Sequence, residues 1–278
     1  MQHVRRRPAR WPWWLVAAAV VAAGGWLLWP DGPPPPGQAP MAAQAPAGAD
    51  PLPPPLMDAG QGAAPVIQHP LEPLDGAAAD EAIPALADSD AAVFDALAGL
   101  AGDPSLLGIL LREHLVQRLV VMVDNLTEPR VTSSVLALRP LPGQYASGDG
   151  EAGSVVQAEA NAARYAPYVA AFTGADAQQL ANTYRRFYPL FQQAYAELAP
   201  PGAYFNDRLV QVIDHLLQAP PPPAGAALVR DERGRMRYLD PALESASVGH
   251  KALMRLSPSQ QAAVKAQLRA VRTGLASP

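Results

Sequence analysis

The sequence contains no cysteine among its 278 residues. It therefore has no disulfide framework, no thiolate metal site and no cysteine that could carry a lipid anchor. It also lacks the H-E-x-x-H motif of metalloproteases, the G-x-S-x-G motif of α/β-hydrolases and a glycine-rich phosphate loop. These absences argue against those three classes of enzyme, and the sequence predicts neither a metal nor a cofactor.

Basic residues are missing from a long part of the chain. No Lys or Arg occurs between Arg10 and Arg112, whereas eleven acidic residues fall in that interval. Residues 1–10 carry four arginines, and residues 112–278 carry 17 basic against 14 acidic side chains. No region has the one-sided charge of a nucleic-acid-binding protein, so no nucleic-acid partner is predicted.

Tryptophan does not occur after residue 29, and all five tryptophans lie in one uncharged apolar run over residues 11–29. As a helix this run is about 28 Å long, close to the roughly 30 Å hydrocarbon core of a bilayer. Its tryptophans gather at both ends, where indole rings prefer the membrane–water interfaces. We therefore predict one transmembrane helix that contacts the lipid bilayer. The predicted anchor residues are Arg5, Arg6, Arg7, Arg10, Trp11, Trp13, Trp14, Trp26 and Trp29.

The charge pattern predicts the orientation of this helix. Positive charge is retained on the cytoplasmic side, so residues 1–10 are expected in the cytoplasm and the chain after Trp29 on the other side of the membrane. A cleaved signal peptide is the alternative. The apolar run is longer than that of a signal peptide and continues past the small residues 22–24, which favours an uncleaved membrane anchor.

Proline dominates the next segment. Between Pro30 and Pro73, 14 of 44 residues are proline, and most of the others are small or polar. Proline runs cannot form helices or sheet ladders, and few large apolar groups are present to offset the entropy of ordering. Residues 30–87 are therefore predicted to be a disordered, semi-stiff spacer.

Residues 88–273 are predicted to form a mainly α, helical-bundle-like extramembrane domain, followed by a short tail at 274–278. Apolar residues at spacings of three and four predict helices over residues 90–100, 104–125, 161–172, 176–198, 206–217 and 258–272. Residues 228–230 and 236–239 flank a turn and predict a small β-hairpin, and residues 135–138 a short strand.

Several local signals refine these boundaries. Ser89 is expected to cap the first helix, and Pro189 to kink or divide the fourth. Phe205 and Val210 fit a hydrophobic staple around a helix that opens at Asn206. Ser257 to Gln260 fits a capping box.

A set of short motifs resembles a known family. The motifs are Val123-Asp124-Asn125-Leu126, Arg139-Pro140-Leu141-Pro142-Gly143, Arg164-Tyr165, Tyr188-Pro189-Leu190, Phe205-Asn206-Asp207-Arg208-Leu209 and Ile213-Asp214-His215-Leu216-Leu217. Together they resemble DUF3014, a family of proteobacterial proteins of unknown function. The resemblance covers residues 88–272 and implies a bacterial envelope protein. It brings no known activity and no catalytic residue.

Polar residues on the predicted helix 206–217 are the main candidates for a site. Asp207 and Asp214 share one face, about 10.5 Å apart along the axis, which is borderline for a hydrolase with paired carboxylates. His215, next to Asp214, suits a general base, or a metal ligand if His114, Asp124 or His250 joins it. The structural alternatives are that Asn206 and Asp207 cap the helix and that His215 is a half-buried, hydrogen-bonded residue.

Four further residues complete the candidate ligand or partner site. Arg208 lies on the same predicted helix, while Arg164 and Tyr165 either tie helices together or line a cleft. Tyr188 ends a run of aromatic and basic residues, 184–188, that suits a sugar or an anionic ligand, or else belongs to a core stripe.

Two functions follow from these observations. The first is a non-enzymatic binding or scaffolding protein, anchored in the inner membrane and extended on a spacer toward an envelope protein or the cell wall. The second is a membrane-tethered envelope hydrolase or glycan-binding protein that uses Asp207, Asp214 and His215. Convergence of the candidate side chains on one pocket would favour the second, and scattered ties between helices the first.

Overall fold

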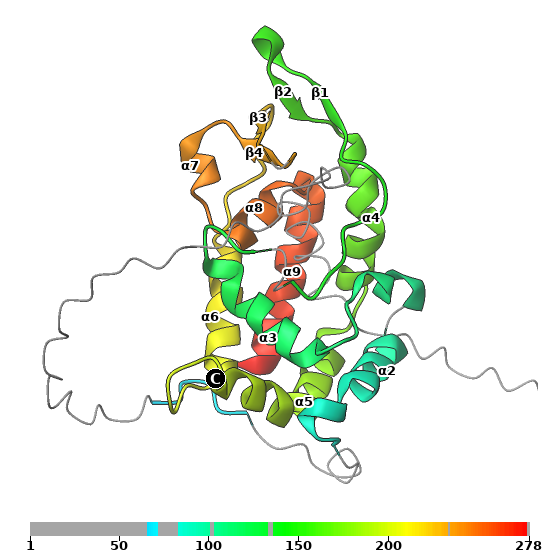
Figure 1. The fold of residues 1–278 in the computed structure, drawn as a ribbon, viewed down its shortest axis with the longest axis vertical. Coiled ribbons are helices and arrows are strands. Elements are labelled where there is room, and N and C mark those ends of the chain that lie inside the picture. Colours follow the sequence, from blue (N-terminus) through cyan, green and yellow to red (C-terminus); the bar gives the residue numbers. More distant parts are fainter. Residues whose placement is uncertain (1–65, 72–82, 101–102, 133–135, 233, 277–278) are drawn as a thin grey trace, which may run out of the picture.

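The computed structural model describes residues 66–71, 83–100, 103–132, 136–232 and 234–276 of the chain (Figure 1). The predicted membrane helix at 11–29 lies outside these residues, as does most of the predicted spacer. None of the described helices is both long enough and apolar enough to cross a membrane.

The described part of the chain is mainly helical, as the sequence predicts, and contains one small antiparallel sheet of four strands. Its α-helices are α2 (Asp90–Leu100), α3 (Leu115–Asp124), α4 (Ala160–Thr173), α5 (Ala177–Ala196), α6 (Phe205–Leu217), α7 (Pro241–Glu244), α8 (Val248–Met254) and α9 (Pro258–Leu275). Its strands are β1 (Ser147–Asp149), β2 (Val155–Gln157), β3 (Ala227–Arg230) and β4 (Met236–Tyr238). Short 3₁₀ turns η2 (Leu86–Asp88), η3 (Pro104–Ile109), η4 (Asn125–Thr127) and η6 (Glu151–Gly153) join them.

Helix α9 is the centre of the helical body and packs against α4, α5 and α6 (Figure 1). Its buried residues Val264, Leu268, Val271 and Leu275 recur at spacings of three and four, so one continuous stripe faces the core. The predicted capping box of Ser257 and Gln260 is present and fixes the start of the helix. The helix continues to Leu275, so the domain ends later than the predicted boundary at residue 273.

Helices α5 and α6 form an aromatic layer of the core. Asp176 caps α5, and Pro189 lies inside the helix without dividing it. Helix α6 begins at Phe205, with Tyr204 as its N-cap, so the predicted start at Asn206 is one residue too late. Phe205 is therefore the first helical residue rather than the residue before the cap, and its ring stacks on Phe191 with centroids 5.9 Å apart.

The predicted helix over residues 104–125 is confirmed only in its second half, as α3, because the chain first forms η3 and an extended stretch. The extended stretch pairs with residues 137–139, through Leu111 N–H to the Ala137 carbonyl at 2.8 Å. Helix α3 is then capped from α2, since the Asp90 carboxylate accepts the N–H groups of His114 and Leu115, both at 2.8 Å. This cap comes from a residue 24 positions away, so local periodicity cannot reveal it.

The sheet has the order β1-β2-β3-β4 and lies at one end of the helical body (Figure 1). The predicted hairpin is confirmed as β3 and β4, in which Leu228 pairs with Tyr238. Strands β1 and β2 were not predicted. The predicted strand at 135–138 is reduced to a single bridge between Leu138 and Leu110, and residue 135 lies outside the described residues.

A fully buried arginine holds the sheet against α8. Arg255 donates to the Tyr145 hydroxyl at 2.6 Å and to the Met236 carbonyl at 3.1 Å. Its guanidinium carbon lies 4.5 Å from the centre of the Tyr238 ring, a cation–π contact. These residues form a small core with Leu228 and Met254, separate from the main helical core.

The folded part begins before the predicted boundary at residue 88. Leu86 in η2 is buried, and the hydroxyl of Ser89 donates to its carbonyl at 2.8 Å instead of capping α2. Residues 66–71, inside the predicted disordered spacer, also have a defined place in the structure. We call them the docked segment, because they bind to the start of α6.

Candidate functional site

The docked segment is held through its backbone. The Asp207 carboxylate accepts the N–H groups of Gln68 and His69, at 2.9 and 2.7 Å. The Tyr204 hydroxyl accepts the N–H of Leu71 at 3.1 Å. Because these contacts reach main-chain groups, they recognise an extended segment rather than particular side chains.

Asn206 completes this attachment. It is buried, and its amide donates to the carbonyl of His69 at 2.8 Å and to that of Leu275 at 3.0 Å. The structural alternative expected Asn206 and Asp207 to cap their own helix, but their side chains do not do so. They bind a segment far away in the sequence.

Asp214 and Arg272 form an ion pair between α6 and α9. The carboxylate accepts from two guanidinium nitrogens, one of them at 2.8 Å. This hydrogen bonding raises the pKa of Arg272, which keeps the guanidinium charged. The side chains are 36 and 40 % exposed, so solvent screens the pair.

His215 joins α6 to α8. Its Nε2 atom lies 2.7 Å from the Ser247 hydroxyl, and its ring stacks on that of His250 with centroids 4.0 Å apart. The Nε2 atom of His250 in turn lies 2.7 Å from the His215 carbonyl. Burial first, and then the charges of His250 and Arg208, lower the pKa of His215. The imidazole is therefore held in its neutral form, as one layer of a stacked pair.

Three of the predicted site residues share one hollow, which we call the α6 pocket. Its volume is about 360 Å³, and it is lined by Gln68, His69, Asp207, Val210, Gln211, Asp214, His215 and Gln218. Asp207, Asp214 and His215 thus converge as the ligand-site hypothesis expected. Each of them nevertheless already binds another group of the protein. No group of three metal-binding side chains that could hold an ion occurs among the described residues.

The other predicted site residues lie elsewhere and act as ties. Arg208 pairs with Asp124 at 2.6 Å and also donates to the Asp124 carbonyl and to Thr127, which joins α6 to the end of α3. Arg164 donates to three carbonyls of the loop 141–143 at 2.9–3.1 Å, which fixes this loop on α4.

The two candidate tyrosines also belong to the packing. Tyr165 is buried in the main core. The Tyr188 hydroxyl donates to Gln192 at 2.7 Å, and its ring packs against Tyr184 and Tyr204. Burial first of all raises the pKa of Tyr188, so it remains a neutral phenol. The run 184–188 is therefore part of the aromatic core.

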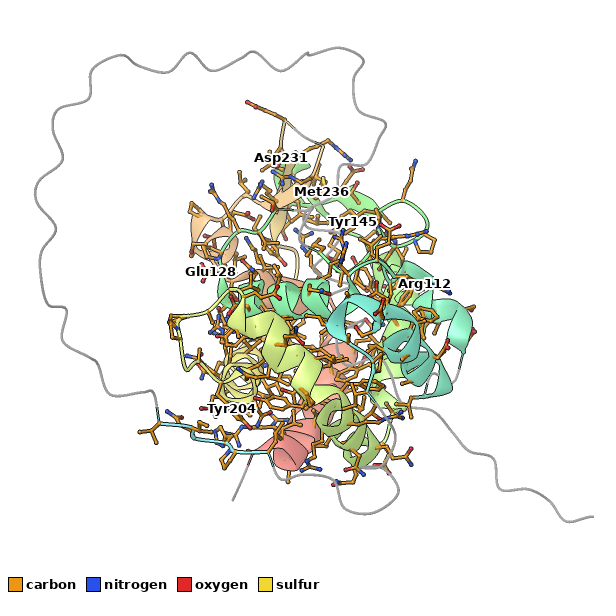
Figure 2. All side chains as sticks on the ribbon, turned by 60° about the horizontal axis from the view of Figure 1, so that its bottom comes forward. Arg112, Glu128, Tyr145, Tyr204, Asp231 and Met236 are labelled. Carbon is orange, nitrogen blue, oxygen red and sulfur yellow. The ribbon has the colours of Figure 1, made fainter. Side chains whose placement is uncertain are left out.

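Sequence reasoning missed a second and larger hollow, the basic cleft, at the opposite end of the molecule. Figure 2 shows the two ends, with Tyr204 near the docked segment and Asp231 near the sheet. The cleft has a volume of about 690 Å³. It is lined by Pro129, Arg130, Val131, Thr132, Arg230, Asp231, Glu232, Arg235, Arg237, Val248 and Lys251.

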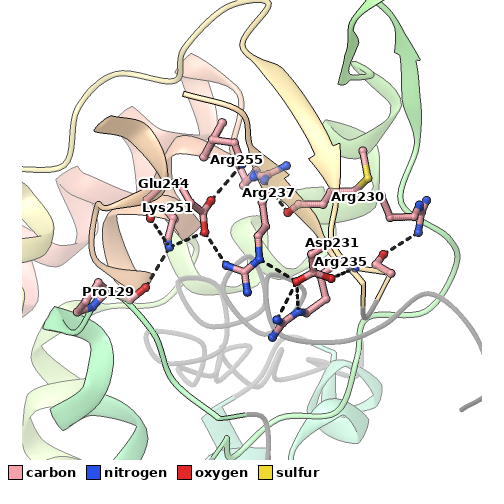
Figure 3. Close-up of polar contacts among 11 residues, drawn as sticks. Pro129, Arg230, Asp231, Arg235, Arg237, Glu244, Lys251 and Arg255 are labelled. Carbon is pink, nitrogen blue, oxygen red and sulfur yellow. Dashed lines mark hydrogen bonds and ion pairs between the residues drawn. The ribbon is translucent and has the colours of Figure 1, made fainter. Parts of the chain in front are cut away.

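A network of ion pairs organises the wall of the basic cleft (Figure 3). Asp231 accepts from Arg235 and from Arg237, both at 2.8 Å. Partial burial alone would raise the pKa of Asp231, but the hydrogen bonds from these arginines outweigh it and hold the pKa well below its usual range. Glu244 links the network to α8, through Arg237 at 2.6 Å and Lys251 at 3.3 Å.

Lys251 is the most buried cation of this network. Its side chain is only 3 % exposed, and its ammonium donates to the carbonyls of Pro129 and Glu244 at 3.0 and 2.8 Å. Burial lowers the pKa of Lys251, against the attraction of Glu244. The cleft was not predicted because its cations come from three distant parts of the chain. The only local signal was the closeness of Arg235, just before β4, and Arg237, on β4.

Comparison with known proteins adds a family but no relative of known activity. No curated protein and no solved structure matches this chain. A family model described as "Protein of unknown function (DUF3014)" matches residues 115–272, which is more than half of the chain and includes α6, the sheet hairpin and α8. The chain therefore belongs to the DUF3014 family.

Proposed function

We propose that this chain is a binding or scaffolding protein of the bacterial envelope, without catalytic activity of its own. One helix over residues 11–29 anchors it in the inner membrane, and the folded domain lies in the periplasm, where it contacts another envelope protein or the cell wall. The anchor and the orientation rest on the sequence alone, namely the apolar run with tryptophans at both ends and the arginines that precede it.

The observation that supports a non-enzymatic role is the way the candidate catalytic groups are used. Asp207 binds two backbone N–H groups, Asp214 binds Arg272, and His215 contacts Ser247 and His250. A general acid or base must have a reacting group within hydrogen-bond reach. Here those positions are filled by the protein itself.

Topology is tested by labelling introduced cysteines, which the natural absence of cysteine makes unambiguous. Ala224→Cys is in an exposed turn after α6, and Gln2→Cys is in the basic N-terminus. A membrane-impermeant maleimide added to spheroplasts is expected to label position 224 but not position 2. Labelling of position 2 alone would contradict the proposed orientation.

Binding is tested with the full chain as bait in envelope extract. A fragment that starts at residue 88 would lack the docked segment and Leu86, so it is not equivalent. We expect a protein or cell-wall partner that is retained by both the wild type and the Asp207→Ala/Asp214→Ala/His215→Ala variant. A Gln218→Ala variant, which alters the same pocket without breaking a tie, is the matched control.

A glycan-binding or hydrolytic role is the second candidate, and one observation favours it. Asp207, Asp214 and His215 line a common pocket of about 360 Å³. Loss of a bound glycan or small ligand only in the triple variant would support this alternative and would justify a search for turnover.

A further inference from the structure

The basic cleft contains more positive than negative charge. Five cations line it, whereas its lining includes only two carboxylates, those of Asp231 and Glu232. Glu244 behind the wall adds a third carboxylate. The cleft therefore keeps an excess of positive charge even when every ion pair of the network is counted.

Three of the arginines that line the cleft have hydrogen-bond donors to spare. Arg130 is exposed, and its side chain makes no hydrogen bond or ion pair within the part of the chain that the structure describes. In Arg235 and Arg237, Asp231 and Glu244 occupy some of the guanidinium nitrogens, while Nη1 of Arg235 and Nη2 of Arg237 bind no described residue. Each guanidinium carries five N–H donors, so donors remain for a ligand.

The network also fixes where these donors lie. The Asp231 carboxylate accepts hydrogen bonds from Nε of both Arg235 and Arg237, and Glu244 accepts one from Nη1 of Arg237 (Figure 3). Two arginine side chains are thus ordered before any ligand arrives, which reduces the entropy that binding must overcome. Preorganised guanidinium groups match the geometry of phosphate oxygens and bind them through paired hydrogen bonds.

Size and lining narrow the class of ligand. A volume of about 690 Å³ is in the range of pockets that hold whole small molecules, well beyond a bare inorganic anion. Pro129 and Val131 add apolar surface next to the cations. A ligand that matches both features carries a phosphate group joined to a larger, partly apolar body.

We propose that the basic cleft binds a phosphate ester, with Arg130, Arg235 and Arg237 on the phosphate and Pro129 and Val131 against the remainder of the molecule. This inference deepens the proposed binding function and rests on it. The phosphate ester is the headgroup of an anionic lipid or a soluble phosphorylated metabolite, since both present the same chemistry to the cleft.

The test is calorimetric titration of the full chain in a neutral detergent. Glycerol 3-phosphate is the soluble probe, and dihexanoyl phosphatidic acid is the lipid probe. Glycerol and acetate are the matched controls without a phosphate. Arg130→Gln removes one charge-assisted contact and is expected to weaken binding at least about tenfold. Arg269→Gln, an exposed arginine on α9 outside the cleft, is expected to leave binding unchanged.

The titrations either support the proposed phosphate-ester site or overturn it. Binding of both probes, or of either one, with loss in Arg130→Gln supports the proposal, and the tighter probe identifies the source of the phosphate. Equal binding by the wild type and Arg130→Gln, equal binding of acetate, or no binding at all overturns it. A partner retained in the envelope pull-down would still support the proposed function in that case, so the two failures are distinguishable. The Arg130 side chain makes no hydrogen bond or ion pair with the described residues, so the variant is expected to fold like the wild type.

Discussion

The α6 pocket and the basic cleft lie at opposite ends of one domain and use charge in different ways. In the α6 pocket both carboxylates are bound by the protein itself, Asp207 by two backbone N–H groups of the docked segment and Asp214 by Arg272. In the basic cleft one carboxylate, Asp231, serves two arginines, and Arg130 has no partner among the described residues. The first arrangement is complete without a ligand, whereas the second leaves charge and donors available.

The comparison shows that a concentration of titratable residues in the sequence is a poor guide to a vacant site. Five polar residues of α6 lie close together in the sequence, but the fold uses all of them for internal contacts: Asn206, Asp207, Arg208, Asp214 and His215. The excess of positive charge in the basic cleft arises only when the fold brings distant segments of the chain together.

The largest loss of stability is expected when the shared carboxylate of the basic cleft is removed. Asp231→Ala removes the shared partner of Arg235 and Arg237, whose side chains are 13 and 24 % exposed. We expect the free energy of unfolding to fall by about 2–3 kcal/mol, because two partly buried cations lose their hydrogen-bonded carboxylate. Urea unfolding followed by circular dichroism measures this change.

The pH dependence of stability provides a second test of the Asp231 carboxylate. The pKa of Asp231 is held below its usual range in the folded protein, so its stabilisation is present above the unfolded value of about 4. It is lost as the pH falls through the folded pKa. The difference in stability between wild type and Asp231→Ala should stay constant from neutral pH to about pH 4 and shrink below it. A difference that grows on acidification would contradict this account.

Asp207→Ala tests the attachment of the docked segment and is expected to have the next largest effect. Loss of two carboxylate-to-backbone hydrogen bonds should cost about 1 kcal/mol and act locally. Amide exchange at Gln68 and His69 is expected to speed up, while the amides of α9 remain protected. Gln218→Ala, in the same pocket, should leave the exchange of the segment unchanged. Unaltered exchange in Asp207→Ala would show that the segment does not depend on this carboxylate.

A smaller effect is expected from the stacked histidines. The pKa of His215 is lowered by burial, by His250 and by Arg208, so the unfolded chain binds a proton at this site more readily. Stability should therefore decrease as the pH drops from above about 6.5 through the folded pKa of His215. Thermal unfolding across this range should show the decrease in the wild type and a weaker one in His215→Gln. An equal decrease in both proteins would assign the effect to other groups.

The smallest expected effect is that of Asp214→Asn. Its ion pair with Arg272 is about as exposed as a surface pair, so we expect a loss below about 1 kcal/mol. Added salt should weaken the wild type's advantage further. A loss as large as that of Asp231→Ala, measured by the same urea unfolding, would remove the distinction between the two hollows.

The helices that the sequence predicted best are those whose signals are local. The capping box at the start of α9, the extent of α5 (predicted over 176–198) and the hairpin of β3 and β4 all depend on residues within a few positions. The first half of the predicted helix over 104–125 failed because its apolar spacing continues through a stretch that pairs with residues 137–139 instead. Strands β1 and β2 have three residues each, too few for a periodic pattern.

For the candidate site too, the sequence predicted what depends on nearby residues and missed what depends on distant ones. The sequence identified three residues that do line a common pocket, because seven or eight positions along a helix return to the same face. It could not show that Asp207 is occupied by residues 68 and 69, since that contact spans more than 130 positions. The cleft near the sheet was missed for the same reason, because Arg130 and Lys251 approach Arg237 only in the folded chain.

The bonds made by Asn206 have a mechanical consequence. One buried amide group links the docked segment, at the beginning of the described chain, to the last turn of α9. Tension applied along the backbone from residue 66 is therefore transmitted to α6 and α9 before it reaches η2 or α2. If the chain is tethered upstream of this segment, the domain is pulled through its two central helices, and the smaller helices at its edge are shielded from the load.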